Sequence, residues 1–413
     1  MNELRSPLID PSEWCLDPQL TFLNHGSFGA CPIDILDAQR RLQRDLERSP
    51  VRFYLDQLPH LLSEARSRAA GLVGAPEEGL VFVSNASEGV ATALDMVEWR
   101  AGDEVIVSGD TYPACRHMLT DLSGRFGVKV RVAQAPFAGS EEGWRRAVYQ
   151  AFHDEVSDRT RLILIDHITS PTALVYPVAE LVALARACGA ISLVDGAHAP
   201  AQLDLNLTEL NPDFYTGNLH KWVMTPKSGA LLYISPRWRE RARPRVISHG
   251  YLAPSERRLH SLFDWVGTRD YSALCVLPQT LDWIEARVSL SSLRARNHQL
   301  AMSARELISA TLWPQGVALP PASALAHMAA IPLPSSLSDL DDSSVEARPV
   351  GSASSEALHP LQRALIERSI EVPVINTAHG FMIRVSAQAY NSLDQYERLA
   401  DILVELSRPA HQV

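Results

Sequence analysis

Four segments of this 413-residue chain combine a short apolar run with polar side chains that come directly after it. The polar groups are Asp195-Gly-Ala-His198 after residues 190–194, Asn218-Leu-His-Lys221 after 213–217, Asp166-His-Ile-Thr-Ser170 after 162–165, and Ser84-Asn-Ala-Ser87 after 80–83. In an open parallel sheet, ligands bind at the carboxyl ends of the strands. We therefore expect a carboxylate, imidazoles, an amine and hydroxyls to converge on one sheet edge.

Two common ligand-binding loops do not occur in the sequence. No Gly-x-Gly-x-x-Gly follows the first predicted strand, and the chain has no Gly-x-x-x-x-Gly-Lys-Ser/Thr. These absences disfavour a nicotinamide-dependent dehydrogenase and a P-loop nucleotidase.

One cofactor needs the whole predicted set of groups. Pyridoxal phosphate requires a lysine for its aldehyde, a carboxylate for its ring nitrogen, donors for its phosphate, a partner for its phenolic oxygen and a flat group against its ring. Lys221 is the candidate Schiff-base lysine, and Asp195 is the candidate partner of the ring nitrogen. The helix that opens near Ser87 would offer free backbone N–H groups and a positive dipole end to the phosphate.

The sequence resembles the class V aminotransferase family of fold-type I pyridoxal-phosphate enzymes, and within it the isopenicillin N epimerase-like branch. The matching segments follow the family order between residues 22 and 386. They are Phe22-Leu-Asn-His-Gly-Ser-Phe-Gly29, Ser84-Asn-Ala-Ser-Glu-Gly89, Asp166-His-Ile-Thr-Ser-Pro-Thr-Ala173, Val194-Asp-Gly-Ala-His-Ala-Pro200, Gly217-Asn-Leu-His-Lys-Trp222, Gly267-Thr268 and Arg384-Val-Ser386.

The resemblance implies a role for each matching position. Lys221 and Asp195 would be the catalytic pair, and Arg384 would hold the substrate α-carboxylate while Asn24 and His25 line the substrate side. The other implied cofactor contacts are Ala86, Ser87, Asn218 and His220 at the phosphate, His198 and Ser170 near the phenolic oxygen, and Tyr112 against the ring. Gly267 and Thr268 would reach the phosphate of the neighbouring subunit, which implies a homodimer with shared active sites.

The elements that must position these groups alternate between strands and helices, which predicts an α/β fold with a mostly parallel, doubly wound sheet. The predicted strands are 80–83, 104–107, 129–133, 162–165, 190–194, 214–216 and 230–234. The predicted helices are 33–47, 58–72, 90–99, 178–188 and, in one or two pieces, 278–312. A smaller C-terminal α/β layer should contain strands 327–331 and 381–386, helices 356–368 and 393–406, and a surface loop at 335–355. The resemblance implies the seven-stranded sheet of fold-type I, and we expect an N-terminal arm (1–20), a large cofactor-binding domain (21–285) and a small domain (286–413).

The amino-acid composition limits which partners, metal sites and cellular locations are expected. The net charge of −10 argues against nucleic acid as the main partner. The five cysteines are scattered without metal-ligand spacing, so neither a disulfide framework nor a metal site is expected. The amino terminus lacks an apolar signal core, and the uncharged stretch 307–338 contains five prolines, so we expect a cytoplasmic protein without a membrane span.

The resemblance leaves several reactions open at the Cα and Cβ of an amino acid. A cysteine desulfurase is disfavoured, because its sulfur-accepting cysteine precedes the arginine that matches Arg384 and this chain has no cysteine after Cys275. We favour a lyase that cleaves the β C–S bond of a cysteine conjugate in specialised metabolism, such as antibiotic biosynthesis, by analogy with lincosamide-pathway relatives. The alternatives are an epimerase, whose second acid–base group could be Tyr215, His25 or Tyr112, a decarboxylative deaminase or an aminotransferase. A pyridoxal-phosphate-binding protein without turnover is disfavoured, because Lys221, Asp195 and Arg384 are all intact.

Overall fold

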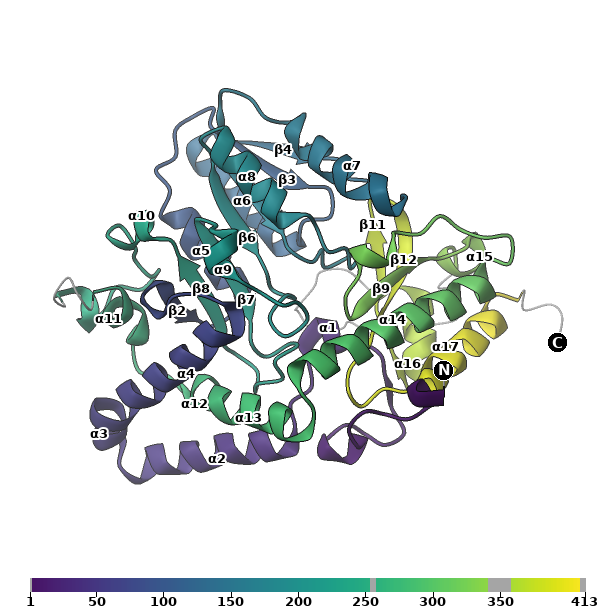
Figure 1. Ribbon diagram of the computed structural model, residues 1–413, viewed down its shortest axis with the longest axis horizontal. Helices are drawn as coiled ribbons and strands as arrows, with labels where there is room; N and C mark the ends of the chain where they lie inside the picture. The colour runs from purple at the N-terminus through teal and green to yellow at the C-terminus, as the bar shows by residue number, and fades with distance from the viewer. Residues whose placement is uncertain (1, 253–257, 341–357, 409–413) are drawn as a thin grey trace.

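The computed structural model describes residues 2–252, 258–340 and 358–408. Figure 1 shows two α/β parts side by side, a larger one that holds most of the chain and a smaller one formed by its C-terminal third. The long helix α14 (Leu290–Leu312) runs along the smaller part and packs against its strand β9 (Met328–Pro332). None of the helices within the described ranges is both long enough and apolar enough to cross a membrane.

The larger part is built around a seven-stranded sheet in the order β2-β8-β7-β6-β5-β3-β4. Its strands are β2 (Leu80–Val83), β3 (Glu104–Ser108), β4 (Lys129–Ala133), β5 (Thr160–Asp166), β6 (Ile191–Asp195), β7 (Phe214–Asn218) and β8 (Ala230–Ile234). Strand β8 is antiparallel to its neighbours β2 and β7, and the remaining pairs of the sheet are parallel. The predicted mostly parallel sheet is therefore confirmed.

Each face of this sheet packs against its own helices, because alternate residues of a strand point to opposite faces. In β5, Leu162 and Leu164 join one apolar cluster with α5 and α6, whereas Ile163 and Ile165 join another with α7 and α8. These helices are α5 (Ala86–Asp95), α6 (Pro113–Phe126), α7 (Glu141–His153) and α8 (Val178–Ala187). Burying one such side chain stabilises the fold by about 1.5–3 kcal/mol. The ends of the central strands are therefore held from both faces.

The turn from β2 into α5 differs from the prediction. The side-chain oxygen of Asn85 accepts a hydrogen bond from the backbone N–H of Glu88 at 2.9 Å, and the Glu88 carboxylate accepts one from the N–H of Ser84 at 2.7 Å. This reciprocal cap starts α5 at Ala86, which agrees with the predicted helix opening near Ser87, whereas the predicted range 90–99 lies four residues too far along the chain because α5 covers Ala86–Asp95. The first N–H groups of α5 consequently lie at the carboxyl edge of the sheet.

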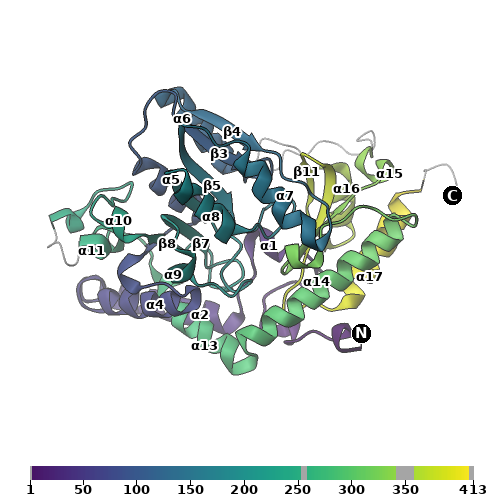
Figure 2. The same cartoon turned by 45° about the horizontal axis from the view of Figure 1, so that its top comes forward.

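Helices from both sides of the strand region in the sequence pack together, since α4 (Leu58–Val73) contacts β2 and α13 (Leu277–Arg287) packs on α4 (Figure 2). The predicted helices 33–47 and 58–72 are confirmed as α2 (Ile33–Arg48) and α4 (Leu58–Val73), and the predicted stretch 278–312 is α13 (Leu277–Arg287) followed by α14. The shorter helices are α1 (His25–Phe28), α3 (Pro50–Arg52), α9 (Leu207–Leu210), α10 (Pro236–Arg239), α11 (Arg258–Asp264) and α12 (Ser272–Cys275).

The smaller part contains an antiparallel sheet in the order β11-β12-β9, with β11 at Val374–Thr377 and β12 at Gly380–Ser386. Helix α17 (Leu393–Leu406) matches the predicted helix 393–406. Helix α16 (Pro360–Glu367) lies within the predicted range 356–368 but starts later, since His359 is its N-cap and residues 356–357 lie outside the described residues. The loop prediction is wrong at its start, since 335–338 form the short helix α15 (Ser335–Ser338), and residues 341–357 lie outside the described residues. Strand β1 (Thr21–Phe22) pairs with β10 (Ile370–Glu371), which ties the N-terminal segment to this part.

Candidate active site

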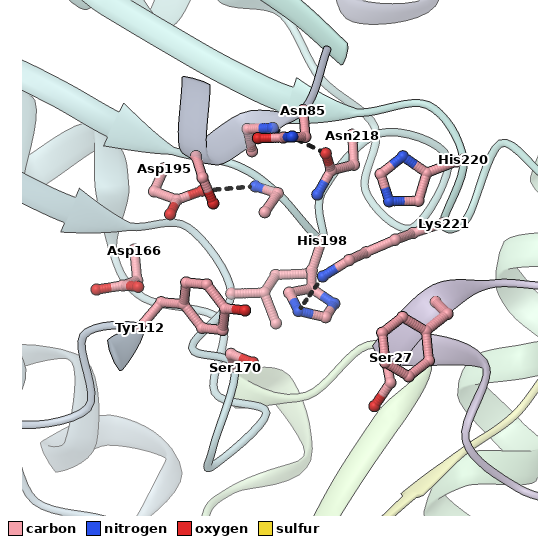
Figure 3. Close-up of a pocket in the computed structure, with 15 residues that line it drawn as sticks. Ser27, Asn85, Tyr112, Asp166, Ser170, Asp195, His198, Asn218, His220 and Lys221 are labelled. Atoms are coloured by element: carbon pink, nitrogen blue, oxygen red, sulfur yellow. Dashed lines mark hydrogen bonds between the residues drawn. The ribbon is translucent and has the colours of Figure 1, made fainter. Parts of the chain in front are cut away.

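A cavity of about 220 Å³ opens at the carboxyl edge of the seven-stranded sheet (Figure 3), and we call it the strand-edge cavity. It brings together most of the predicted cofactor contacts. Those on its wall are Ala86, Ser87, Tyr112, Ser170, Asp195, His198, Asn218, His220 and Lys221. The structure adds Ser27, Phe28, Asn85, Asp166, Ile168 and Ala197 to the same wall.

The amine of Lys221 points into this cavity from the turn that follows β7 (Figure 3). Its Nζ lies 3.1 Å from Nε2 of His198, whose Nδ1 accepts a hydrogen bond from the indole N–H of Trp222 at 3.4 Å. Burial, and next the charge of Arg384, lower the pKa of Lys221 to about 7. A large fraction of this amine is therefore unprotonated near neutral pH and can act as a nucleophile or base.

The backbone around Lys221 is approached closely by the N-terminal segment. Gly29 has a φ of +71°, and a Cβ at this position would collide with the carbonyl oxygen of His220. A residue without a side chain is needed where the backbone has positive φ and lies so close to another chain segment. Gly29 thereby lets α1 pack directly against the lysine turn.

Asp195 ends β6 and lies beside Asp166 of β5 in the sheet register. Its Oδ1 accepts a hydrogen bond from the N–H of Ala197 at 3.0 Å, and its Oδ2 lies 3.5 Å from the donating thiol of Cys115. Burial raises the pKa of Asp195. The positive charge in the cavity wall that favours ionisation of Asp195 is that of Lys221. A cationic ring N–H placed next to the Asp195 carboxylate would supply a further positive partner.

Asp166 is the second buried carboxyl group at this edge. Its Oδ2 accepts a hydrogen bond from the hydroxyl of Thr111 at 2.8 Å. Burial, and next the nearby charge of Asp195, raise the pKa of Asp166 to about 8. Two neighbouring carboxyl groups do not readily ionise together, so Asp166 carries a proton near neutral pH.

The other end of the cavity is suited to an anion. The Oδ1 of Asn218 accepts a hydrogen bond from the N–H of Ala86 at 2.9 Å, while the N–H of Ser87, in the first turn of α5, has no acceptor within the helix. Nδ1 of His220 is buried and has no hydrogen-bond partner among the described residues. The free N–H groups and the positive end of α5 attract a phosphate.

Arg384 lies on β12, in the wall of a second cavity of about 590 Å³ that we call the side cavity. Its guanidinium donates hydrogen bonds to the carbonyl oxygen and the hydroxyl of Ser170 and, at 3.0 Å, to the hydroxyl of Ser27. Its Nε has no partner among the described residues. Burial lowers the pKa of Arg384 to about 10, so the group stays positively charged at neutral pH.

The two cavities adjoin, since Ser27, Tyr112 and Ser170 line both of them. Tyr112 precedes α6 and is 41% exposed, and burial of the rest of the ring raises the pKa of its phenol. Tyr112 therefore keeps its proton at neutral pH and stands between the two spaces as a potential proton donor.

Two of the predicted substrate contacts lie elsewhere. His25 is fully buried, with its ring nitrogens 2.7 Å from the Tyr390 hydroxyl and 3.0 Å from the carbonyl oxygen of Lys221. Asn24 accepts a hydrogen bond from the hydroxyl of Ser27 at 2.6 Å. Neither residue lines the strand-edge cavity or the side cavity, and Ser27 takes the place expected for them.

Gly267 and Thr268 also lie outside the walls of both cavities of their own chain. Their expected contact with the phosphate of a neighbouring subunit involves a second chain and stays a prediction.

Sequence reasoning missed the contacts that Asp166 and Cys115 make. Asp166 carried a signal, since it comes directly after an apolar run like the residues that were assigned roles. Cys115, in the first turn of α6, carried no such signal in the sequence.

The buried groups fit pyridoxal phosphate. The unpartnered imidazole nitrogen and the start of α5 suit its phosphate, Asp195 suits its ring nitrogen, and the weakly basic Lys221 suits its aldehyde. All of these groups line the same small cavity. The described residues contain no cluster of His, Cys, Asp or Glu that could hold a metal ion.

Comparison with known proteins supports the same family. Residues 49–399 match the model of the aminotransferase class-V family. The chain is 30% identical to isopenicillin N epimerase from Streptomyces clavuligerus, over 95% of this chain and 96% of that protein. It is 31% identical to a probable chloroplastic L-cysteine desulfhydrase from Arabidopsis thaliana, over 95% of this chain and 84% of that protein.

The fold is also similar to solved structures. A variant of C-DES with glycine covalently linked to its pyridoxal-phosphate cofactor superposes with a TM-score of 0.77 at 19% identity, covering 97% of this chain and 99% of the other. At that identity the likeness shows the shared fold, which is that of the fold-type I enzymes.

Proposed function

We propose that this chain, which belongs to the class-V aminotransferase family and is a pyridoxal-phosphate-dependent enzyme, is a lyase that cleaves the β C–S bond of a cysteine derivative. The overall reaction converts an S-substituted cysteine and water into pyruvate, ammonia and a thiol. Support comes from one relative named as a probable L-cysteine desulfhydrase and another named as hercynylcysteine sulfoxide lyase.

When bound, the cofactor supplies an electron-accepting ring next to the substrate Cα. The residues of the chain provide the rest of the chemistry. Arg384 would hold the α-carboxylate with its guanidinium, which keeps the Cα–H bond in one orientation. Asp195, held by the N–H of Ala197 and the thiol of Cys115, would keep the ring nitrogen protonated.

Proton movement would be divided between two residues. The Lys221 amine, with its pKa lowered to about 7, can take the Cα proton at neutral pH. Tyr112, whose raised pKa keeps its phenol protonated, can give a proton to the departing sulfur. The proton taken from carbon and the proton given to sulfur thus balance, and the C–S bond pair leaves with the thiol.

The observation that favours elimination over epimerisation is the position of the three candidate second acids. The hydroxyl of Tyr215 is buried against Nδ1 of His167 at 2.9 Å, and His25 is buried against Tyr390. Only Tyr112 of the three lines the strand-edge cavity. Inversion at Cα needs a second acid on the opposite face, and two of the candidates are bonded elsewhere.

Epimerisation remains the second candidate function, because Tyr112 could serve as that second acid and a relative is named isopenicillin N epimerase. Incubation of the holoenzyme with S-methyl-L-cysteine in deuterated water separates the outcomes. Pyruvate and methanethiol support the lyase. Deuterium at Cα with inversion supports the epimerase instead, an aldehyde supports decarboxylative deamination, and the pyridoxamine form of the cofactor supports transamination.

Cysteine desulfuration is not proposed, because a sulfur-accepting thiol is missing from the sequence between Cys275 and the C-terminus. We also propose that the protein is a cytoplasmic homodimer in which Gly267 and Thr268 contact the partner's phosphate site. Support comes from exposed apolar residues in the neighbouring segment, where Tyr251 is 54% and Leu252 is 88% exposed. Light scattering of the holoenzyme at micromolar concentration tests the assembly, and a monomer with full activity would contradict it.

A further inference from the structure

The side cavity lies beside the strand-edge cavity and is more than twice as large, about 590 Å³ against 220 Å³. One wall comes from the turn between β3 and α6, residues 109–113, and from Arg116 and His117 on α6. The opposite wall comes from the smaller part of the molecule, at Pro373 and residues 375–378. Strand β11 is the strand of the small sheet that lies nearest to α7 in both views (Figures 1 and 2).

The size of this space bears on the substrate. Cavities that enclose drug-sized ligands have volumes of about 300–1,000 Å³, and the side cavity falls in this range. The thiol of free cysteine, held at Arg384, would leave most of it to water. A substrate with a long substituent on sulfur would fill it and gain the apolar contacts of Pro171, Pro373 and Ile375.

The polar groups on the wall suit a negatively charged end of that substituent. The guanidinium of Arg116 is held at the cavity by its Nε, which donates a hydrogen bond to the carbonyl oxygen of Thr111 at 3.0 Å. Within the described part of the chain, its other nitrogens take part in no hydrogen bond or ion pair. A guanidinium with its two outer nitrogens free can bind a carboxylate with two parallel hydrogen bonds.

Asp110 lines the same cavity, and burial raises the pKa of its carboxyl group while His379 and, more weakly, Arg116 lower it. Asp110 is buried, and its Oδ2 lies 3.4 Å from the hydroxyl of Tyr176 and 3.9 Å from Nε2 of His379. No ion pair joins Asp110 to Arg116 within 4.0 Å. Arg116 therefore interacts with Asp110 only at a distance, and the outer nitrogens of its guanidinium have no directly bonded carboxylate among the described residues.

We propose that the side cavity binds the distal part of an S-substituted cysteine and that Arg116 recognises an anionic group, such as a carboxylate, at the end of the substituent. This inference rests on the proposed C–S lyase function for the reaction itself. Arg384 would hold the α-carboxylate of the substrate, and Arg116 would select the substrate by the charge at the far end of its substituent.

The test compares two substrates of equal length, S-(3-carboxypropyl)-L-cysteine and its neutral amide S-(3-carbamoylpropyl)-L-cysteine, with S-methyl-L-cysteine as a short reference. We expect wild-type holoenzyme to prefer the acid over the amide by at least about tenfold in kcat/KM, the size of one charged hydrogen bond. Arg116→Gln should remove this preference and change kcat/KM for S-methyl-L-cysteine less than about threefold. Arg125→Gln, on the same helix but paired with Asp121, is the matched control and should keep the preference.

A binding measurement makes the inference independent of turnover. The non-cleavable analogue 2-aminooctanedioic acid, which has a methylene group in place of sulfur, is titrated into holoenzyme by calorimetry. Its Kd should rise about tenfold or more in Arg116→Gln and stay unchanged in Arg125→Gln. Equal Kd values in wild type and Arg116→Gln, or an equal loss for acid and amide, would overturn the inference.

The two failures are distinguishable. If none of the three cysteine derivatives gives pyruvate, the lyase function is wrong, and the Kd of the dicarboxylate still decides the role of Arg116. If all three give pyruvate at equal kcat/KM, the lyase function stands and the recognition of an anionic end is wrong.

Discussion

The strand-edge cavity and the side cavity share three wall residues yet are built in opposite ways. In the strand-edge cavity the ionisable groups of Lys221 and Asp195 each have a polar partner within the protein, with the Lys221 amine 3.1 Å from His198 and the Asp195 carboxylate accepting a hydrogen bond from the N–H of Ala197. In the side cavity Arg116 and His117 are exposed, and the terminal nitrogens of Arg116 have no partner among the described residues.

The difference follows from where the walls come from. Side chains at the ends of packed strands have little freedom, so they can hold reacting groups in a fixed geometry. The side cavity lies between two parts of the molecule, where residues can change without disturbing the sheet. We infer that the first cavity determines the chemistry and the second determines the choice of substrate.

The largest expected effect is at the amine of the strand-edge cavity. Lys221→Ala should lower the rate of pyruvate formation by at least about 10³-fold, because it removes the covalent link to the cofactor and the proton carrier together. Borohydride treatment followed by mass spectrometry should fix the cofactor to wild type and not to the variant. Lys227→Ala, an exposed neighbour outside both cavities, is the control. Wild-type protein that stays colourless after addition of cofactor would end the assignment.

The next effect concerns the carboxylate at the ring position. Asp195→Asn should retain the cofactor but lose about 10²–10³-fold in kcat, because a neutral amide no longer stabilises a positive ring nitrogen. Asp204→Asn is a suitable control, since the side chain of Asp204 is 94% exposed. Cofactor content is read from absorbance and turnover from pyruvate release, and turnover that matches the control would place the ring nitrogen elsewhere.

Arg384→Gln tests the boundary between the cavities. The variant should raise KM for S-methyl-L-cysteine by about 10–100-fold with a smaller change in kcat, because it removes charged hydrogen bonds to the α-carboxylate. The control measures competitive inhibition by S-methylcysteamine, which lacks the α-carboxylate. Its Ki should differ little between wild type and Arg384→Gln. An unchanged KM would mean that the α-carboxylate binds at another residue.

The pH dependence of Lys221 sharpens the contrast with an ordinary surface lysine. Only the unprotonated amine attacks an aldehyde, so the rate at which apoprotein takes up pyridoxal phosphate should rise with pH and level off above about 7. In Arg384→Gln the midpoint should move to higher pH, because the charge of Arg384 lowers the pKa of Lys221. Stopped-flow absorbance measures both curves, and a rise that continues beyond pH 10 in wild type would show an ordinary lysine.

The smallest expected effect is on stability. The pKa of Asp166 is raised from about 3.8 in the unfolded chain to about 8 in the folded chain. Its contribution to the free energy of unfolding is therefore fully present below pH 3.8 and is lost as the pH rises through 8. The melting temperature of Asp166→Asn should therefore rise relative to wild type as the pH goes from 4 to 8, by roughly 2–4 °C per kcal/mol, and the difference should level off above pH 8. Circular dichroism of the apoproteins gives the two curves. If both proteins lose stability in parallel between pH 5 and 9, Asp166 is ionised throughout.

The sequence by itself determined the main sheet and the groups at its edge. The predicted strands 80–83, 129–133 and 230–234 match β2, β4 and β8 residue for residue. Lys221 and Asp195 were found because a polar residue after a buried apolar run must lie at a strand end. Such patterns are local, and local patterns are visible in a sequence.

Only the tertiary structure decided which distant groups meet. His25 was expected to line the substrate side, yet it is buried against Tyr390, 365 positions away in the chain. The thiol of Cys115 on α6 reaches Asp195 at the end of β6, and Arg116 faces a wall supplied by the smaller part of the molecule. These contacts depend on how helices and sheets pack, and a separation of a few ångströms between elements decides whether a side chain enters a cavity or fills the core.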